Sequence, residues 1–81
     1  MQITVYAFAM LRERLNRSKI DLEVPQGTSV GSLWEHLGID AQESSLWSKQ
    51  ILFAINREYA SSEAVLHDGD EVALIPPVAG G

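Results

Sequence analysis

Apolar and polar residues alternate in two stretches near the start of the chain, residues 3–8 and residues 19–24. The positions predicted to face inward are Ile3, Val5 and Ala7 in the first stretch and Ile20, Leu22 and Val24 in the second. A period of two with β-branched and aromatic residues is typical of strands that bury one face. We therefore expect two strands, joined by a short helix or turn in which Met10 and Leu11 lie near Leu15.

The period changes to that of a helix in residues 30–38. Its apolar positions at i, i+3, i+4 and i+7 are Val30, Leu33, Trp34 and Leu37. Thr28 or Ser29, in the turn sequence PQGTS, can cap this helix, and Gly38 can end it in a left-handed conformation. Residues 39–50 are polar with isolated apolar positions, so a loop with one helical turn is expected there.

Two more strands are expected in the second half of the chain. Residues 51–56 (ILFAIN) form a continuous apolar run, which indicates a strand covered on both faces and followed by a turn at NRE. A second turn at HDGD precedes the last strand, residues 71–75. Pro76 and Pro77 end sheet pairing because proline has no N–H.

The order strand, strand, helix, strand, strand predicts an α+β domain with a mixed sheet, one main helix packed across it and an extended C-terminal tail. This is the β-grasp, or ubiquitin-like, arrangement, in which the last strand lies beside the first. We expect a domain over residues 1–75 and a flexible tail over residues 76–81 that ends in Gly-Gly.

Composition limits the classes of partner. The 81 residues are 46% hydrophobic, which is enough for one modest core. A net charge of -5 repels phosphate backbones and anionic headgroups, so no nucleic acid and no membrane partner is expected. The chain has no run near the ~20 apolar residues of a membrane helix and no signal-peptide pattern, so a cytoplasmic location is expected.

Side chains offer little chemistry of their own. The absence of cysteine excludes disulfides, thiolate catalysis and Cys-based zinc sites, so any sulfur must be supplied from outside. His36 and His67 have no obvious nucleophile and carboxylate beside them, and residues 68–70 lack the other ligands of a calcium loop. No phosphate-binding glycine motif occurs, and Trp34 and Trp47 are interpreted as packing residues.

The C-terminal stretch PPVAGG is therefore the strongest candidate for function. Six residues at about 3.3 Å each can extend about 20 Å, far enough to enter a deep pocket of a partner. Gly80 and Gly81 have no Cβ, so a narrow channel can close around them. Adenylation of the Gly81 carboxylate would supply a good leaving group, and a sulfur nucleophile could then form a thiocarboxylate on the main chain.

Three stretches carry a resemblance to a known family: VYAFAMLRERL, AINRE and LHDGDEVALIPPVAGG. Together they resemble the small subunits of molybdopterin synthase, which are β-grasp sulfur carriers. The resemblance spans nearly the whole chain, and the ending DGDEVA…PPV.GG is its most specific part. A terminal Gly-Gly is also shared with the thiamine-pathway sulfur carrier and with processed ubiquitin-like modifiers.

The resemblance implies a set of partners and one reaction. An adenylating enzyme related to ubiquitin activators would use ATP on Gly81, and a sulfurtransferase system would supply the sulfur. The thiocarboxylate would enter the large synthase subunit, in a heterotetramer, and donate sulfur to cyclic pyranopterin monophosphate to build the dithiolene of molybdopterin. The chain would act as a recycled cosubstrate that binds no cofactor or metal itself.

The resemblance also implies which residues contact the large subunit. Phe8 and Ile75 would form part of an apolar docking surface with Arg12 at its edge. The inserted segment would comprise Pro76, Pro77, Val78, Ala79, Gly80 and Gly81. An aromatic residue is often found at position 75 in the family, and its replacement by Ile reduces contact area. Ordinary sheet packing is the alternative interpretation of Phe8 and Ile75.

Three other functions stay open from the sequence. The chain could be a ubiquitin-like modifier that joins Gly81 to lysines. It could carry sulfur for thiamine or another biosynthetic pathway, which shares the adenylation step. It could also be an interaction domain that uses no terminal chemistry.

Overall fold

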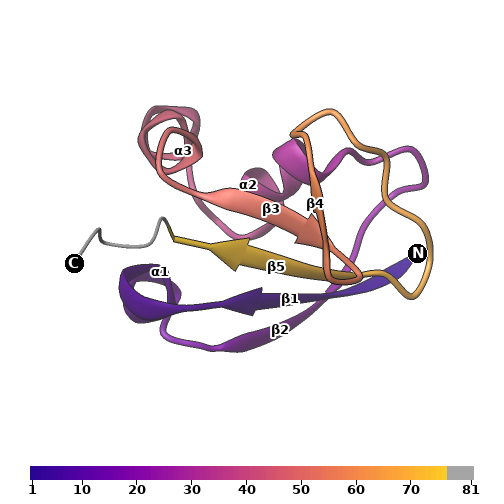
Figure 1. Cartoon of the computed structure of the whole chain (residues 1–81), viewed down its shortest axis with the longest axis horizontal. Coiled ribbons are helices and arrows are strands. Elements are labelled where there is room, and N and C mark those ends of the chain that lie inside the picture. Colours follow the sequence, from indigo (N-terminus) through magenta and orange to yellow (C-terminus); the bar gives the residue numbers. More distant parts are fainter. Residues whose placement is uncertain (77–81) are drawn as a thin grey trace.

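A five-stranded mixed sheet in the order β2-β1-β5-β3-β4 carries the fold (Figure 1). The computed structural model describes residues 1–76. Its strands are β1 (Gln2–Ala7), β2 (Lys19–Glu23), β3 (Leu52–Ile55), β4 (Glu58–Ala60) and β5 (Glu71–Ile75). Its helical segments are α1 (Ala9–Leu15), the 3₁₀ turn η1 (Val30–Ser32), α2 (Leu33–His36) and α3 (Ala41–Ser48).

The last strand lies in the middle of the sheet. β5 runs parallel to β1, with Val72 opposite Val5, and antiparallel to β3, with Leu74 opposite Phe53. The expected pairing of the first strand with the last is confirmed, and so is the mixed sheet of the β-grasp arrangement. Because β5 is hydrogen-bonded on both sides, the position of Ile75 at its end is well defined.

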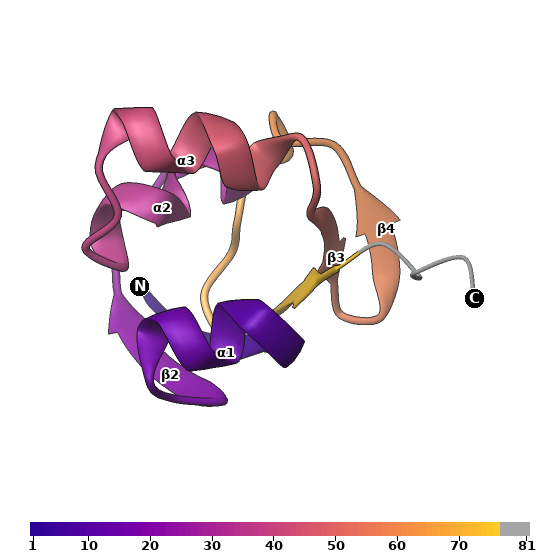
Figure 2. The same cartoon turned by 90° about the vertical axis from the view of Figure 1, so that its left-hand side faces the viewer.

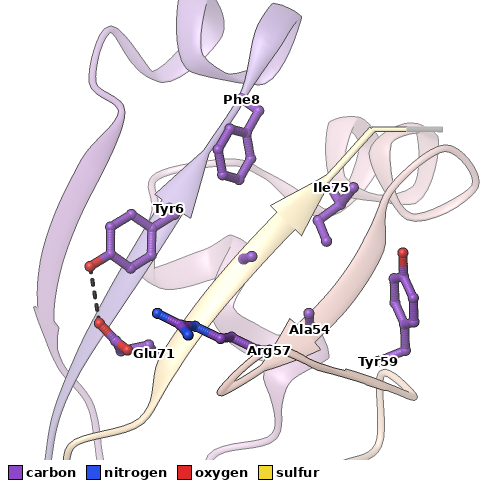
Figure 3. Close-up of a pocket in the computed structure, with 8 residues that line it drawn as sticks. Tyr6, Phe8, Ala54, Arg57, Tyr59, Glu71 and Ile75 are labelled. Atoms are coloured by element: carbon purple, nitrogen blue, oxygen red, sulfur yellow. Dashed lines mark hydrogen bonds between the residues drawn. The ribbon is translucent and has the colours of Figure 1, made fainter. Parts of the chain in front are cut away.

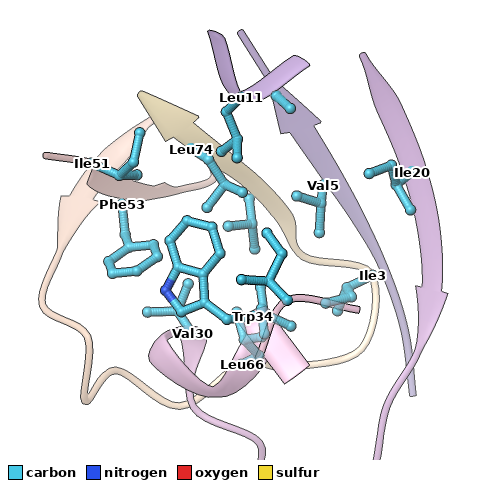
Figure 4. Packing of buried hydrophobic residues seen from close by; sticks show 14 of the residues in the cluster. Ile3, Val5, Leu11, Ile20, Val30, Trp34, Ile51, Phe53, Leu66 and Leu74 are labelled. Atoms are coloured by element: carbon cyan, nitrogen blue, oxygen red, sulfur yellow. The ribbon is translucent and has the colours of Figure 1, made fainter. Parts of the chain in front are cut away.

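One face of the sheet forms the core with the helices. The alternation predicted for β1 is confirmed, since Ile3, Val5 and Ala7 are all buried. From the helical side, Val30, Leu33 and Trp34 pack against the same cluster (Figure 4). The rings of Trp34 and Phe53 lie 6.1 Å apart between centroids. The packing role expected for Trp34 is confirmed, and Trp47 is half-buried against the same core.

The helical layer differs from the single main helix expected. Residues 30–36 are helical as predicted, but they divide into η1 and the four-residue α2. Gly38 follows with φ +82°, the left-handed conformation predicted for it. The predicted cap was wrong: neither Thr28 nor Ser29 caps η1, and the Thr28 hydroxyl instead donates to the Pro25 carbonyl at 2.6 Å.

The expected loop at residues 39–50 is instead a helix, α3. Its N-terminus is capped by Asp40, whose carboxylate accepts a hydrogen bond from the Glu43 N–H at 2.8 Å. None of its residues is fully buried, so the apolar periodicity that reveals an amphipathic helix is absent. This is why the hydrophobic pattern did not predict α3.

Three further expectations about strands and burial were wrong. β4 was not predicted, because a three-residue strand with exposed Glu58 and Tyr59 has no hydrophobic signal. β3 is not covered on both faces, since Leu52 is 52% exposed. Met10 points outward on α1 rather than into the core.

Both α1 and the end of α3 lie at the end of the sheet at which the central strand β5 terminates (Figures 1 and 2). β1 leads directly into α1, and β5 runs parallel to β1. α3 leads into β3, whose first residue Leu52 pairs with Ile75. None of the helices in residues 1–76 is long and apolar enough to cross a membrane. Residues 77–81 lie outside the described part, so the predicted domain boundary stays a prediction.

Candidate functional site

The face of the sheet opposite the core carries a row of four side chains. Tyr6 pairs with Ala73, Ala73 pairs with Ala54, and Ala54 pairs with Tyr59. Cross-strand partners point to the same face, so the row crosses four strands. The two central alanines are small and the two outer tyrosines are large, which leaves a depression between aromatic walls.

This depression has a volume of about 380 Å³ and is open to solvent (Figure 3). We call it the outer-face hollow. It is lined by Tyr6, Phe8, Ala54, Arg57, Tyr59, Glu71, Ala73 and Ile75. These residues come from β1 and the residue after it, from β3, β4 and β5, and from the turn between β3 and β4, so only the tertiary structure brings them together.

The end of the hollow nearest the C-terminus is apolar. The register of β1 and β5 ends with Ala7 opposite Leu74, which places Phe8 beside Ile75. Ile75 in turn pairs with Leu52. Phe8 and Leu52 are 47% and 52% exposed, respectively. Phe8, which directly follows β1, and Leu52 of β3 lie on either side of the end of β5. Large exposed apolar side chains grouped in this way mark an interaction surface, and here that surface adjoins Pro76, which follows β5.

The other end of the hollow is polar. The Tyr6 hydroxyl donates a hydrogen bond to Glu71 Oε2 at 3.1 Å. This bond is the main reason that the pKa of Tyr6 lies above its ordinary value, and burial and the negative charges of Glu71 and Asp21 raise it further. Tyr6 is therefore a neutral donor at physiological pH, and one oxygen of Glu71 is already occupied.

The structure brings together some of the sequence-predicted site residues. Phe8 and Ile75 both line the outer-face hollow, as expected for a shared surface. Arg12 is exposed on α1 and does not line the hollow. Pro76 is half-buried directly after β5. The remaining predicted residues, Pro77, Val78, Ala79, Gly80 and Gly81, lie outside the described residues.

Sequence reasoning missed most of the hollow. The alternation of β1 already placed Tyr6 on the face of Phe8, so that residue could have been found. Tyr59 and Arg57 could not have been found in this way. The strand β4 had not been predicted, and the sequence did not show on which face of the sheet the side chain of Arg57 would lie. Ala54 and Ala73 matter through their small size, which has meaning only once the strands are aligned.

Other groups of polar side chains form no second centre. His67 Nδ1 lies 4.0 Å from Asp70 Oδ2 on the surface turn, and among residues 1–76 no Ser or Thr hydroxyl is hydrogen-bonded to either side chain. Within residues 1–76, no three His, Asp or Glu side chains are grouped so that they could hold a metal ion. Among the described residues, the outer-face hollow is therefore the candidate functional site.

The sequence is similar to known proteins over its whole length. Residues 5–81 match the model of the ThiS family. The molybdopterin synthase sulfur carrier subunit of Mycobacterium tuberculosis is 35% identical over 82 residues, which cover 100% of this chain and 99% of that protein. Relatives of the same name from Arabidopsis thaliana, Homo sapiens and Escherichia coli also align over nearly the whole chain.

Solved structures show the same fold. SAMP1 from Haloferax volcanii superposes with a TM-score of 0.78 at 26% identity, covering 100% of both chains. The complex of subunits 1 and 2 of molybdopterin-converting factor from Helicobacter pylori 26695 contains a chain with a TM-score of 0.66 at 22% identity, again covering 100% of both. These likenesses confirm the ubiquitin-like β-grasp fold.

Proposed function

We propose a chemical role for the C-terminus from the premise that this chain belongs to the ThiS family and, like its full-length relatives, is a molybdopterin synthase sulfur carrier subunit. In this role Gly81 carries the sulfur as a thiocarboxylate. The family match extends through residue 81, and that observation carries the proposal.

The position of β5 supports a role for the tail. β5 is hydrogen-bonded to β1 and β3, so the chain beyond Ile75 starts from a defined point at the apolar end of the hollow. Pro76 and Pro77 have restricted backbones, whereas Gly80 and Gly81 have no Cβ. Such a sequence suits a segment that enters a narrow channel while the domain stays outside.

The proposed reaction uses ATP bound by a partner enzyme. The Gly81 carboxylate attacks the α-phosphate of ATP, which forms an acyl-adenylate and releases pyrophosphate. Hydrosulfide delivered by a sulfurtransferase system then attacks the acyl carbon. The bond to AMP breaks, and a thiocarboxylate, AMP and a proton result. The chain has no cysteine, so no thiol of its own can attack the activated end.

The acceptor step takes place on the large synthase subunit. The thiocarboxylate donates its sulfur to cyclic pyranopterin monophosphate, and water restores the carboxylate for another cycle. Phe8 and Ile75 form the apolar contact with the large subunit, with Arg12 at the edge, in a heterotetramer. The complex of subunits 1 and 2 from Helicobacter pylori supports this pairing, because its fold is shared by this chain.

Intact mass spectrometry after incubation with ATP, a sulfide source and the activating enzyme tests the role of Gly81. We expect a mass increase equal to exchange of one oxygen for sulfur, localised to Gly81 by fragmentation. A variant that lacks Gly81 should keep its circular dichroism spectrum and show no increase. An unchanged wild-type mass, with the activating enzyme shown to work on another carrier, would contradict the proposal.

A ubiquitin-like modifier is the second candidate function. It is favoured by the likeness to SAMP1, which is a small archaeal modifier protein. An isopeptide bond between Gly81 and a lysine, identified by peptide mass spectrometry of cell extracts, would support it. A chain that forms the thiocarboxylate and is never found on lysines would act in sulfur transfer alone.

A further inference from the structure

The turn between β3 and β4 holds an arginine in an unfavourable backbone conformation. Ile55 pairs with Glu58, so Asn56 and Arg57 form a two-residue hairpin loop. Both have positive φ, +50° for Asn56 and +72° for Arg57. Two positive φ values are typical of a type I′ turn, whose second position is normally glycine. At Arg57 the Cβ therefore imposes a steric cost that glycine would avoid.

The rest of the molecule holds this turn in place. The Asn56 N–H donates to the Glu71 carbonyl at 2.8 Å, and the Glu71 N–H donates to Asn56 Oδ1 at 3.0 Å. The Asn56 side-chain amide also donates to Asp70 Oδ1 at 2.9 Å, and Asp70 is only 8% exposed. The turn is thus tied to β5, and these bonds offset the strain at Arg57.

Arg57 projects over the outer-face hollow. In Figure 3 its guanidinium extends across the hollow toward Tyr6 and Glu71. Within residues 1–76, no carboxylate lies within 4.0 Å of it, since the ion pairs there join Arg14 to Glu43 and His67 to Asp70. The nearby Glu71 carboxylate instead accepts the Tyr6 hydroxyl.

A partner that covers the hollow would remove Arg57 from water. A buried guanidinium is tolerated only when acceptors replace the lost water, and a planar carboxylate can do so through two parallel hydrogen bonds. The surrounding Tyr6, Ala54, Tyr59 and Ala73 would exclude water from such a pair. The arrangement is similar to that of an energetically central interface residue, namely an arginine beside aromatic and apolar side chains, with the carboxylate of Glu71 at the polar end of the same hollow.

We propose that Arg57 determines specificity at the outer-face hollow. It binds a carboxylate presented there by the large synthase subunit. This inference rests on the proposed function. It explains why the turn keeps an arginine where glycine would be more stable. A large subunit without an acidic residue at the matching place should bind this chain weakly.

The test measures affinity and stability together. Calorimetric titration of the cognate large subunit into wild type and R57A should show binding weakened at least about tenfold at low salt. The difference should shrink as NaCl is raised, and R57E should bind more weakly than R57A. R57G should bind as weakly as R57A yet melt at a higher temperature than wild type, because the strain at φ +72° is removed.

R17E is the matched control, since Arg17 is exposed and does not line the hollow. It should bind the large subunit as wild type does. Wild-type affinity in R57A and R57E, or an equal loss in R17E, would overturn the role of Arg57 while the proposed function stood. If unmodified and thiocarboxylated wild type both failed to bind the large subunit, both proposals would fall.

Discussion

Three hydrogen bonds converge on the carboxylate of Glu43 in α3. Arg14 of α1 donates through Nε at 2.6 Å and Nη2 at 2.8 Å, and Trp47 donates through Nε1 at 2.9 Å. The Arg14 and Glu43 side chains are 45% and 29% exposed, so the pair contributes only modestly to stability. Its importance is geometric, because it joins the last turn of α1 to the first turn of α3.

This network should make stability depend on pH. The hydrogen bonds from Arg14, and then that from Trp47, hold the pKa of Glu43 below its ordinary value of 4.5. Ionised Glu43 therefore stabilises the folded state above pH 4.5. This contribution to the free energy of unfolding is lost as the pH falls through the lower pKa that Glu43 has in the folded state. E43Q should melt slightly below wild type at pH 7, and the two melting curves should converge as the pH falls below 4.5.

Thermal melts by circular dichroism from pH 7 to pH 3 would measure this effect. E13Q is the matched control, because Glu13 is exposed on α1 and makes no side-chain hydrogen bond within residues 1–76. A difference between wild type and E43Q that stayed constant with pH would show that the charge of Glu43 plays no part.

At the scale of elements, the start of η1 is held by the loop before β5. The N–H groups of Val30 and Gly31 donate to the carbonyls of Ala64 and Ser62, each at 2.9 Å. The Leu66 N–H returns a bond of 2.9 Å to the Thr28 carbonyl. Backbone from a distant segment thus satisfies the first donors of the helix, which is why the Ser29 side chain is not needed as a cap.

Gly31 leaves no room for a side chain at this junction. A Cβ there would lie 2.8 Å from the Ser62 carbonyl oxygen and 2.9 Å from Ser62 Cβ. G31A should therefore push the loop away and reduce the free energy of unfolding by about 1–3 kcal/mol. Urea denaturation would measure the loss, and S61A, an exposed change in the same loop, should be neutral. A urea midpoint for G31A equal to that of wild type would show that the loop around Ser62 moves aside at no cost in stability.

The elements differ in how well the sequence predicts them. β1 and β2 were predicted because each buries alternate side chains such as Val5 and Ile20, and burial leaves a period of two in the sequence. α3 and β4 bury too little surface to leave such a pattern. β4 forms through its pairing with β3, which the local sequence does not display. The cap of α3 is local, because Asp40 and Glu43 are three residues apart, and that spacing is a signal of a helix start that the hydrophobic pattern does not contain.

At the scale of the whole molecule, the two faces of the sheet have separate uses. One face packs against the helices, and the other exposes the apolar end of the hollow beside the start of the tail. A partner could therefore bind the domain through this face and receive the tail in the same event. The affinity of the domain would help position Gly81 at the reacting centre.

A comparison of Phe8 with Met10 can distinguish binding through this face from binding through the rest of the surface. Both are large and exposed, at 47% and 63%, but only Phe8 lines the hollow. F8D should weaken binding of the large subunit about thirtyfold, the effect of removing a central apolar contact. The fold should persist, because Phe8 is the N-cap of α1 and aspartate is a favourable residue there.

M10D provides the comparison, since it adds the same charge two residues away on α1. Its affinity for the large subunit should match that of wild type in the same titration. Equal losses in F8D and M10D would indicate general charge repulsion rather than contact through the hollow.

The sequence by itself determined which faces of the two opening strands are buried, and it contains the glycine pair on which the proposed terminal chemistry rests. These properties are local, since a period of two and a run of residue types are visible in the chain alone. Only the tertiary structure decided that Tyr6, Ala54, Ala73 and Tyr59 form one row and that Arg57 lies above it. Strand register and the β3–β4 turn depend on pairing between distant segments, and such pairing is set by packing of the whole core.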